Sequence, residues 1–122
     1  MRSFGELEAR VMAVIWDHAE PVSVRVVVDE LAGERAVAYT TAITVIERLR
    51  AKGWLVRERA GRSYLYAATC EEHEYAAHLM NSALEDSGNR SAALLSFAGQ
   101  LDATEAEALR AALAQSDGDP GP

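Results

Sequence analysis

The chain has 122 residues, is 49% hydrophobic and carries a net charge of −7. This length supports one ordinary hydrophobic core with a small appended element, and no apolar run reaches the roughly 20 residues of a membrane span. A signal-peptide pattern is absent and the single cysteine, Cys70, cannot form an internal disulfide, so we expect a cytoplasmic protein without membrane insertion.

Positive charge is concentrated in one segment of this acidic chain. Residues 33–70 contain seven Lys/Arg and three Asp/Glu, whereas residues 1–32 contain three and six, and residues 71–122 contain two and ten. A local basic face is what attracts a phosphate backbone, so the overall acidity does not exclude a nucleic-acid partner.

The N-terminal segment predicts a helix over about residues 6–18. Its apolar residues are spaced i, i+4, i+7 and i+8, which places Leu7, Val11, Val14 and Ile15 on one face. Gly5 is a suitable N-cap, Glu8 follows three residues later, and Pro21 lies just beyond the expected end.

Residues 22–31 fit two patterns. Alternating valines favour a strand, whereas Val24, Val27, Val28 and Leu31 form a helical stripe. A helix is favoured because Ser23 can cap its start and Gly33 its end, and a short strand near residues 21–23 remains an alternative.

The basic segment joins a helix to a hairpin. Residues 39–52 predict a helix whose apolar stripe is Ala42, Val45, Ile46 and Leu49, and Gly53 is placed to end it. The period then changes to two, which predicts strands over 55–59 and 63–67 around a tight turn at 60–62. This order predicts a winged helix-turn-helix, with the helix in a DNA major groove and the hairpin along the backbone.

Three further helices are predicted after the hairpin. The first runs from about residue 71 to a break at 87–89, the second is capped by Ser91, and the third opens with the box Thr104-x-x-Glu107. They are too short and too sparsely apolar to be stable alone, so we expect them to pack against a second copy of the chain. The predicted dimer-interface residues are Leu79, Met80, Leu84, Leu94, Phe97, Leu101, Leu109 and Leu113.

The expected fold is therefore mainly α with a small β-hairpin. A winged-helix DNA-binding domain would occupy residues 1–70, a helical dimerisation region 71–116 and a disordered tail 117–122.

The helix of residues 39–52 and the hairpin supply two groups of candidate DNA contacts. Base contacts are predicted for Thr40, Thr41, Ile43 and Thr44. Phosphate contacts are predicted for Tyr39, Arg48, Lys52, Arg57, Arg59, Arg62 and Tyr64.

Simpler roles remain open for several of these residues. Thr40 or Thr41 could cap the helix, and Ile43 could belong to the edge of the core. The arginines could form surface ion pairs, and one or both of Tyr64 and Tyr66 could be buried.

Metal and catalytic sites are not predicted. His73 and His78 lie five residues apart on a helix and so face different directions, which leaves Cys70 without two convergent partners. Acidic residues are spread over helix surfaces, and no phosphate loop or nucleophile motif is present. We therefore expect a protein without a cofactor that is not an enzyme.

Two motifs resemble the penicillinase-repressor family of bacterial transcription factors (BlaI/MecI/CopY type). Residues 41–53 read T-x-x-T-x-x-x-R-L-x-x-K-G, and residues 61–66 read G-R-x-Y-x-Y. The resemblance extends to about Ser116 and implies a winged-helix homodimer that represses promoters with inverted repeats, at β-lactamase or other resistance and stress genes.

The resemblance also implies regulation by a membrane-bound sensor protease pathway. In several members the chain is cut before the Phe of a Leu-Leu-Asn-Phe-like run, and the corresponding run here ends in Ser96-Phe97, with Ser96 in place of Asn. The copper-responsive branch carries a C-terminal cysteine cluster, which this chain lacks.

The leading functional hypothesis is therefore a dimeric, sequence-specific transcriptional repressor. The alternative is a winged-helix module used for protein–protein assembly without DNA specificity. An assembly surface would be more apolar than residues 33–70, which favours the repressor.

Overall fold

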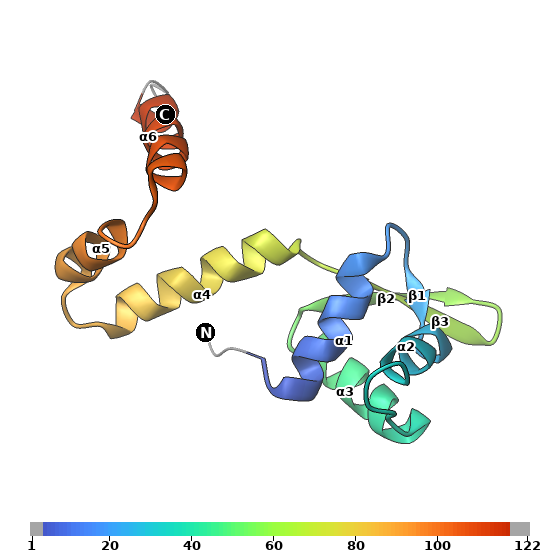
Figure 1. The fold of residues 1–122 in the computed structure, drawn as a ribbon. Coiled ribbons are helices and arrows are strands. Elements are labelled where there is room, and N and C mark those ends of the chain that lie inside the picture. Colours follow the sequence, from blue (N-terminus) through green and yellow to red (C-terminus); the bar gives the residue numbers. More distant parts are fainter. Residues whose placement is uncertain (1–3, 118–122) are drawn as a thin grey trace. The chain divides into compact units, whose positions relative to one another are not determined.

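A computed structural model describes residues 4–117 of the chain (Figure 1). Contacts divide it into two compact units, one ending at Leu79 and the other beginning at Met80. The boundary lies inside a helix, later than the division after residue 70 that the sequence suggests.

The N-terminal unit is a winged helix-turn-helix, as predicted. Its elements are, in chain order, α1 (Glu6–Asp17), β1 (Val22–Ser23), α2 (Val24–Leu31), α3 (Tyr39–Ala51), β2 (Leu55–Ala60) and β3 (Ser63–Ala68). The strands form an antiparallel sheet in the order β1-β3-β2. Gly61, at φ 63°, occupies the hairpin turn in a left-handed conformation that glycine adopts without strain.

Residues 22–31 contain both of the structures that their sequence suggests. Val22 and Ser23 pair with Tyr66 and Leu65 as a short strand. Ser23 also caps α2, because its Oγ accepts a hydrogen bond of 3.2 Å from the Val26 amide. The strand and helix signals therefore belong to successive segments.

One hydrophobic core holds the three helices against the sheet. The predicted stripe of α3 is confirmed in it. Of the predicted stripe of α1, Val11 and Ile15 are buried, and Leu7 and Val14 are half-buried against the core. Tyr66 is buried on β3. Burial of this apolar surface is the main stabilising term for the unit. The core consists of Val11, Met12, Ile15, Val22, Val24, Val27, Leu31, Ala42, Val45, Ile46, Leu49, Leu55 and Tyr66.

The first turns of α4 (Glu72–Asp86) pack on the N-terminal unit through an aromatic cluster. Tyr75 is buried, its ring stacks on Phe4 at 4.1 Å between centroids, and its Oη accepts a 2.8 Å hydrogen bond from the Phe4 amide. The Trp54 ring meets Tyr75 edge-on at 5.1 Å, and the Trp16 indole N–H donates to the Cys70 carbonyl at 2.9 Å. Tyr75 is not among the apolar residues that the sequence analysis names in this helix, namely Leu79, Met80 and Leu84, so its burial is a correction.

The C-terminal unit comprises the rest of α4, α5 (Arg90–Ala98) and α6 (Ala103–Asp117). Both predicted caps are wrong by two residues. Asn89 caps α5 in place of Ser91, accepting from the Ala92 amide at 3.1 Å. Asp102 and Glu105 form the capping box of α6 in place of Thr104 and Glu107, with bonds of 3.0 and 2.8 Å.

The helix α6 continues to Asp117, which corrects the first residue of the predicted tail. The remaining tail residues, 118–122, lie outside the described residues. Across residues 4–117, no helix combines the length and the hydropathy that a membrane crossing requires.

Candidate nucleic-acid interface

Helix α3 buries one face and presents the opposite face to solvent. Ala42, Val45, Ile46 and Leu49 anchor it in the core. The exposed face carries Thr40, Thr41, Thr44 and Arg48. Ala38 is the N-cap and no side chain caps the helix, so the alternative in which Thr40 or Thr41 is a cap does not hold.

The hydroxyl of Thr44 has a restricted hydrogen-bonding role. Its Oγ1 donates to the Thr40 carbonyl at 2.9 Å, one turn earlier in the helix. Its single hydrogen is therefore used, whereas its oxygen lone pairs and methyl group remain available to a ligand. Ile43 is half-buried against the core and offers only part of its side chain.

Arg25 on α2 is a candidate contact that the sequence analysis missed. Its guanidinium lies 5.4 Å from the centroid of the Tyr39 ring, which is 44% exposed at the start of α3. A cation in the first turn of α2 is disfavoured by the helix dipole, and it lies off the valine stripe. An arginine at this unfavourable position was the sequence signal that could have identified Arg25 as a candidate contact. Arg25 and Tyr39 together place a cation and an aromatic hydroxyl at the start of α3.

Glu47 connects α3 to both strands of the hairpin. Its Oε2 accepts hydrogen bonds from the Tyr66 hydroxyl at 2.6 Å and from Arg57 Nη1 at 3.1 Å. Its Oε1 accepts two bonds from the Arg50 guanidinium at 3.1 and 2.9 Å. The hydrogen bond from Arg50 is the largest cause that lowers the pKa of Glu47 to about 2; partial burial opposes it, and the Tyr66 hydroxyl adds to the lowering. Burial, with the Glu47 carboxylate adding to it, raises the pKa of Tyr66.

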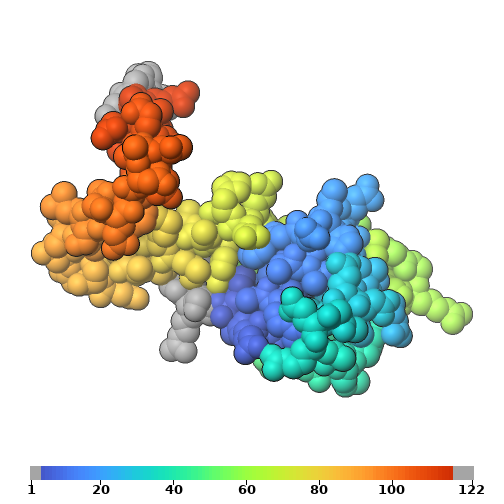
Figure 2. Space-filling view, viewed as in Figure 1, coloured from blue at the N-terminus to red at the C-terminus, as the bar shows by residue number. Residues whose placement is uncertain are grey.

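The hairpin of β2 and β3, here called the wing, projects from the N-terminal unit (Figure 2). The Arg57 guanidinium lies 4.0 Å from the centroid of the Tyr64 ring, and that of Arg59 lies 5.8 Å from the same ring. Arg59 Nε also donates to the Gly61 carbonyl at 3.3 Å. Arg62 is exposed at the turn. The wing therefore holds two cations over one half-buried tyrosine and a third, Arg62, at its turn.

Some of the residues predicted to contact phosphates are already paired with a carboxylate, and others are not. Lys52 is paired with Glu8 at 2.8 Å, and this hydrogen bond, followed by that from the Gly5 amide, lowers the pKa of Glu8. Arg57 is paired with Glu47. Within residues 4–117, no carboxylate pairs with Arg48 on α3, with Arg25 on α2, or with Arg59 and Arg62 on the wing.

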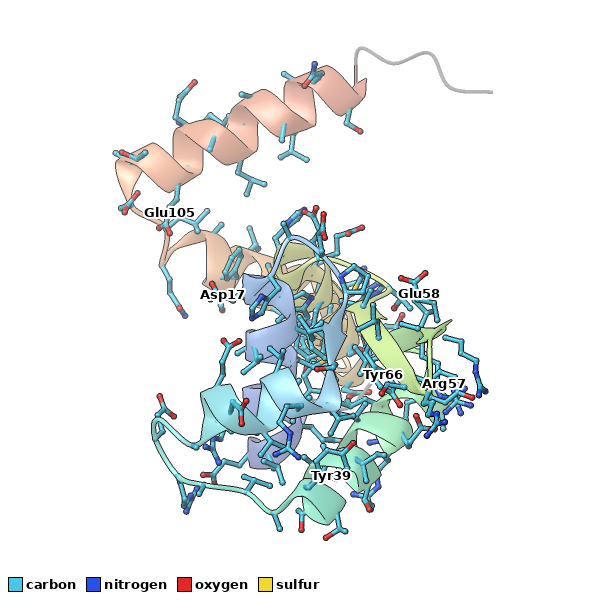
Figure 3. The ribbon with its side chains drawn as sticks, turned by 90° about the vertical axis from the view of Figure 1, so that its right-hand side faces the viewer. Asp17, Tyr39, Arg57, Glu58, Tyr66 and Glu105 are labelled. Atoms are coloured by element: carbon cyan, nitrogen blue, oxygen red, sulfur yellow. The ribbon has the colours of Figure 1, made fainter. Side chains whose placement is uncertain are left out.

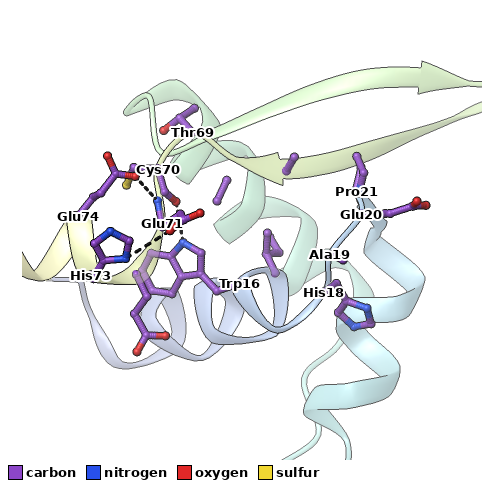
Figure 4. A pocket seen from close by; sticks show the side chains of 14 residues that line it. Trp16, His18, Ala19, Glu20, Pro21, Thr69, Cys70, Glu71, His73 and Glu74 are labelled. Carbon is purple, nitrogen blue, oxygen red and sulfur yellow. Dashed lines mark hydrogen bonds and ion pairs between the residues drawn. The ribbon is translucent and has the colours of Figure 1, made fainter.

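A cavity of about 620 Å³ lies beside the end of α1, the end of β3 and the start of α4 (Figure 4). Glu71, His73 and Glu74 present ligand atoms within 4.8 Å of one another at its edge, and all three are exposed. His73 thus approaches two glutamates, and His78 instead lies 6.4 Å from Trp54, between ring centroids. The cluster resembles many exposed acidic groups that bind nothing.

Most of the predicted dimer-interface residues are exposed to solvent in the single chain. Leu79, Leu84 and Leu101 are half-buried. The others are exposed large apolar side chains, namely Met80, Leu94, Phe97, Leu109 and Leu113. Leu95, which is 75% exposed, was not in the predicted set. Ser96 and Phe97, the predicted cleavage position, lie in the last turn of α5.

Comparison with known proteins gives consistent matches. A family model described as penicillinase repressor matches residues 4–115. The transcriptional regulator BlaI of Mycobacterium tuberculosis is 44% identical over 114 residues, which cover 91% of this chain and 83% of that protein.

Two solution structures resemble the N-terminal part of the chain. The DNA-binding domain of the repressor BlaI has 29% identity and a TM-score of 0.53, covering 62% of this chain and 94% of that one. The monomeric form of Bacillus licheniformis BlaI in complex with the blaP half-operator has 30% identity and a TM-score of 0.51, covering 61% and 89%.

Proposed function

Because the chain belongs to the penicillinase repressor family, whose members are transcriptional repressors and not enzymes, we propose that it represses promoters as a homodimer bound to palindromic operators. The observation that carries this proposal is the exposed face of α3, which carries three threonines and Arg48. Among residues 4–117, Arg48, Arg25 on α2, and Arg59 and Arg62 on the wing have no carboxylate partner. Small polar side chains suit base edges, and free guanidinium groups suit the flanking phosphates.

In the proposed complex, α3 lies in the major groove. Thr44 accepts a hydrogen bond from an exocyclic amino group of adenine or cytosine, or meets a thymine methyl, because its own hydrogen is bound to Thr40. Thr40 and Thr41 retain both donor and acceptor capacity. Ile43 contributes an apolar contact with the part of its side chain that is exposed.

The phosphate contacts flank this groove on two sides. Arg48 on α3 and Arg59 and Arg62 on the wing are the proposed backbone contacts, and Arg25 with Tyr39 would extend them to α2; their exposure supports this proposal. Lys52 and Arg57 remain candidates, although each is already paired with a carboxylate, and Tyr64 remains a candidate through its hydroxyl. The relative bound to the blaP half-operator supports the same use of this domain.

We propose that the C-terminal helices form the homodimer interface. Six large apolar side chains of this region are exposed in the single chain, which favours burial against a second copy. A two-fold pair presents two α3 helices, and this symmetry matches an inverted repeat.

Ser96–Phe97 is the proposed position of inducing cleavage. A cut there separates α6, with Leu109 and Leu113, from the rest of the chain and removes part of the interface. A membrane sensor protease pathway and target genes for β-lactam resistance or stress follow from the family resemblance.

The test is a gel shift on the DNA upstream of the protein's own gene. Wild-type chain is titrated against that fragment and against a duplex of the same composition in scrambled order, at several salt concentrations. The proposal predicts a preferred site with inverted symmetry, and Thr44→Ala weakens binding at particular bases by about 1–3 kcal/mol. Equal binding to both duplexes would favour the assembly-module alternative.

A further inference from the structure

Glu47 is an acidic residue on the helix that the proposed function places against DNA. It precedes Arg48 directly in α3, and its side chain is 32% exposed. An isolated carboxylate at such a position would repel the phosphate backbone and weaken binding to every sequence. A carboxylate at this position of a DNA-binding helix therefore needs a structural explanation.

The carboxylate of Glu47 is fully engaged by hydrogen-bond donors from three elements. Arg50 on α3 supplies two donors to Oε1, Arg57 on β2 supplies one to Oε2, and Tyr66 on β3 supplies another to Oε2. Two guanidinium groups surround one carboxylate, so the cluster as a whole is positive.

We propose that Glu47 is a positioning residue for DNA binding, whose carboxylate ties both strands of the wing to α3. This inference rests on the proposed function. The tie sets where Arg59 and Arg62 lie relative to the exposed threonines of α3, so that bases and flanking phosphates are reached together.

The packing of the wing explains why such a tie is needed. Leu55 is the one buried residue of β2, and the five residues after it are all exposed. On β3, Tyr66 is the buried residue, and Tyr64 nearer the turn is only half-buried. The core thus holds only the base of the wing, and a short hairpin without further packing is marginally stable.

Glu47 extends the attachment outward, because it binds Tyr66 at the base and Arg57, two residues beyond Leu55 on β2; these two side chains lie close together in the sheet (Figure 3). Arg57 pairs with Tyr66 across the sheet and is bound to Glu47, and its guanidinium stacks on the Tyr64 ring at 4.0 Å. Tyr64 in turn lies opposite Arg59. An unbroken series of contacts therefore runs from α3 to the outer half of the wing.

This inference is tested by whether removing the negative charge of Glu47 weakens or strengthens operator binding. Glu47→Ala removes the tie, whereas Glu58→Ala is the matched control, because Glu58 lies on β2, is exposed and has no ion pair among residues 4–117. Both variants lose one negative charge near DNA. Tyr66→Phe keeps the buried ring and removes only the hydroxyl donor to Glu47, and Glu47→Gln keeps an acceptor in place.

Operator affinity, its salt dependence and ethylation interference are measured for these variants and wild-type protein, with thermal unfolding as the folding control. We expect Glu47→Ala to weaken operator binding on the order of tenfold and to reduce the salt slope by about one to two, as wing phosphates are lost. Interference by the phosphates under the wing should disappear while the pattern under α3 persists. Glu47→Gln should recover part of the affinity, and Tyr66→Phe should show the same selective loss to a smaller degree.

The inference is overturned if Glu47→Ala binds as tightly as wild type or more tightly, as Glu58→Ala is expected to do. If Glu47→Ala does not fold at the assay temperature, Tyr66→Phe decides by the same criterion. Failure of wild-type protein to prefer any site would instead contradict the proposed function, so the two failures are distinguishable.

Discussion

The two units of the chain bury their apolar residues very differently. The N-terminal unit encloses 13 residues in one core. In the C-terminal unit, by contrast, no residue from Met80 to Ser116 is buried, although Leu, Met and Phe are present in helical spacing. An apolar stripe therefore predicts that a face becomes buried without saying in which chain its partner lies. The first unit has its own core, and in the proposed homodimer a second copy supplies the partner of the second unit.

The largest effect is expected from truncating a core residue of the N-terminal unit. Leu49→Ala should lower the free energy of unfolding by about 2–5 kcal/mol, because Leu49 is fully buried and its loss leaves a cavity. Denaturant unfolding followed by tryptophan fluorescence measures this. The loss should be the same at every protein concentration, and a loss that vanishes at high concentration would contradict a self-sufficient core.

The second effect concerns the exposed side chains of α5. If the proposed dimer forms through these helices, the double variant Leu94→Ala, Phe97→Ala should weaken dimerisation by about 2–4 kcal/mol, since the proposed contacts of both side chains with the second copy are lost. Sedimentation equilibrium gives the dissociation constant. An unchanged dimer would place the interface elsewhere, and an unfolded N-terminal unit would contradict the independence of the two regions.

A smaller effect follows from the depressed pKa of Glu47. Its pKa is about 2 in the folded chain against 4.5 for the free side chain, so its stabilising contribution is present above pH 4.5 and is lost as the pH falls toward 2. Because about a third of the side chain is exposed, solvent screening leaves about 1 kcal/mol.

Stability from pH 7 to pH 3 should therefore decrease less in Glu47→Gln than in wild type. Glu105→Gln is a control in the C-terminal unit. Parallel pH profiles for Glu47→Gln and wild type would show that the Glu47 cluster contributes nothing to the N-terminal unit.

The smallest effect is expected in the salt dependence of DNA binding, when one arginine from each unit is replaced. Arg62→Ala should reduce the salt slope of DNA binding by about one, because one phosphate contact is lost. Arg110→Ala removes the same charge from α6, where Arg110 pairs with Glu107 at 3.2 Å, and should leave the slope unchanged. Equal salt slopes for the two variants would show that Arg62 on the wing does not contact DNA phosphates.

Much of the N-terminal unit could be predicted from its sequence because local signals agree there. The stripe of α3, the left-handed Gly53 at φ 91° after its end, and the change of period into the wing all indicate the same fold. Residues 22–31 were ambiguous because Ser23 both ends β1 and caps α2.

The errors arose where contacts between distant residues decide the outcome. Tyr75 is buried because the rings of Phe4, Trp16 and Trp54 pack against it. These residues are distant in the sequence, so the residue pattern of α4 alone could not predict the contacts. The α5 and α6 caps were misplaced because Asn89 and Asp102, two residues earlier, offer equally good or better acceptors.

The candidate site was predicted by residue type but not by pairing. Arg48 and Arg62 lie exposed without carboxylate partners among residues 4–117, whereas Lys52 and Arg57 are held by Glu8 and Glu47. Sequence spacing cannot show these pairs, because Lys52 and Glu8 are 44 positions apart.

The most direct test of the account is an amide-resolved NMR titration of the full chain with its upstream operator duplex and with a scrambled duplex. The account predicts that the operator selectively shifts the amides of residues 39–44 and 59–62, at a ratio of two chains per duplex. Identical shifts with both duplexes, or shifts confined to α5 and α6, would contradict it.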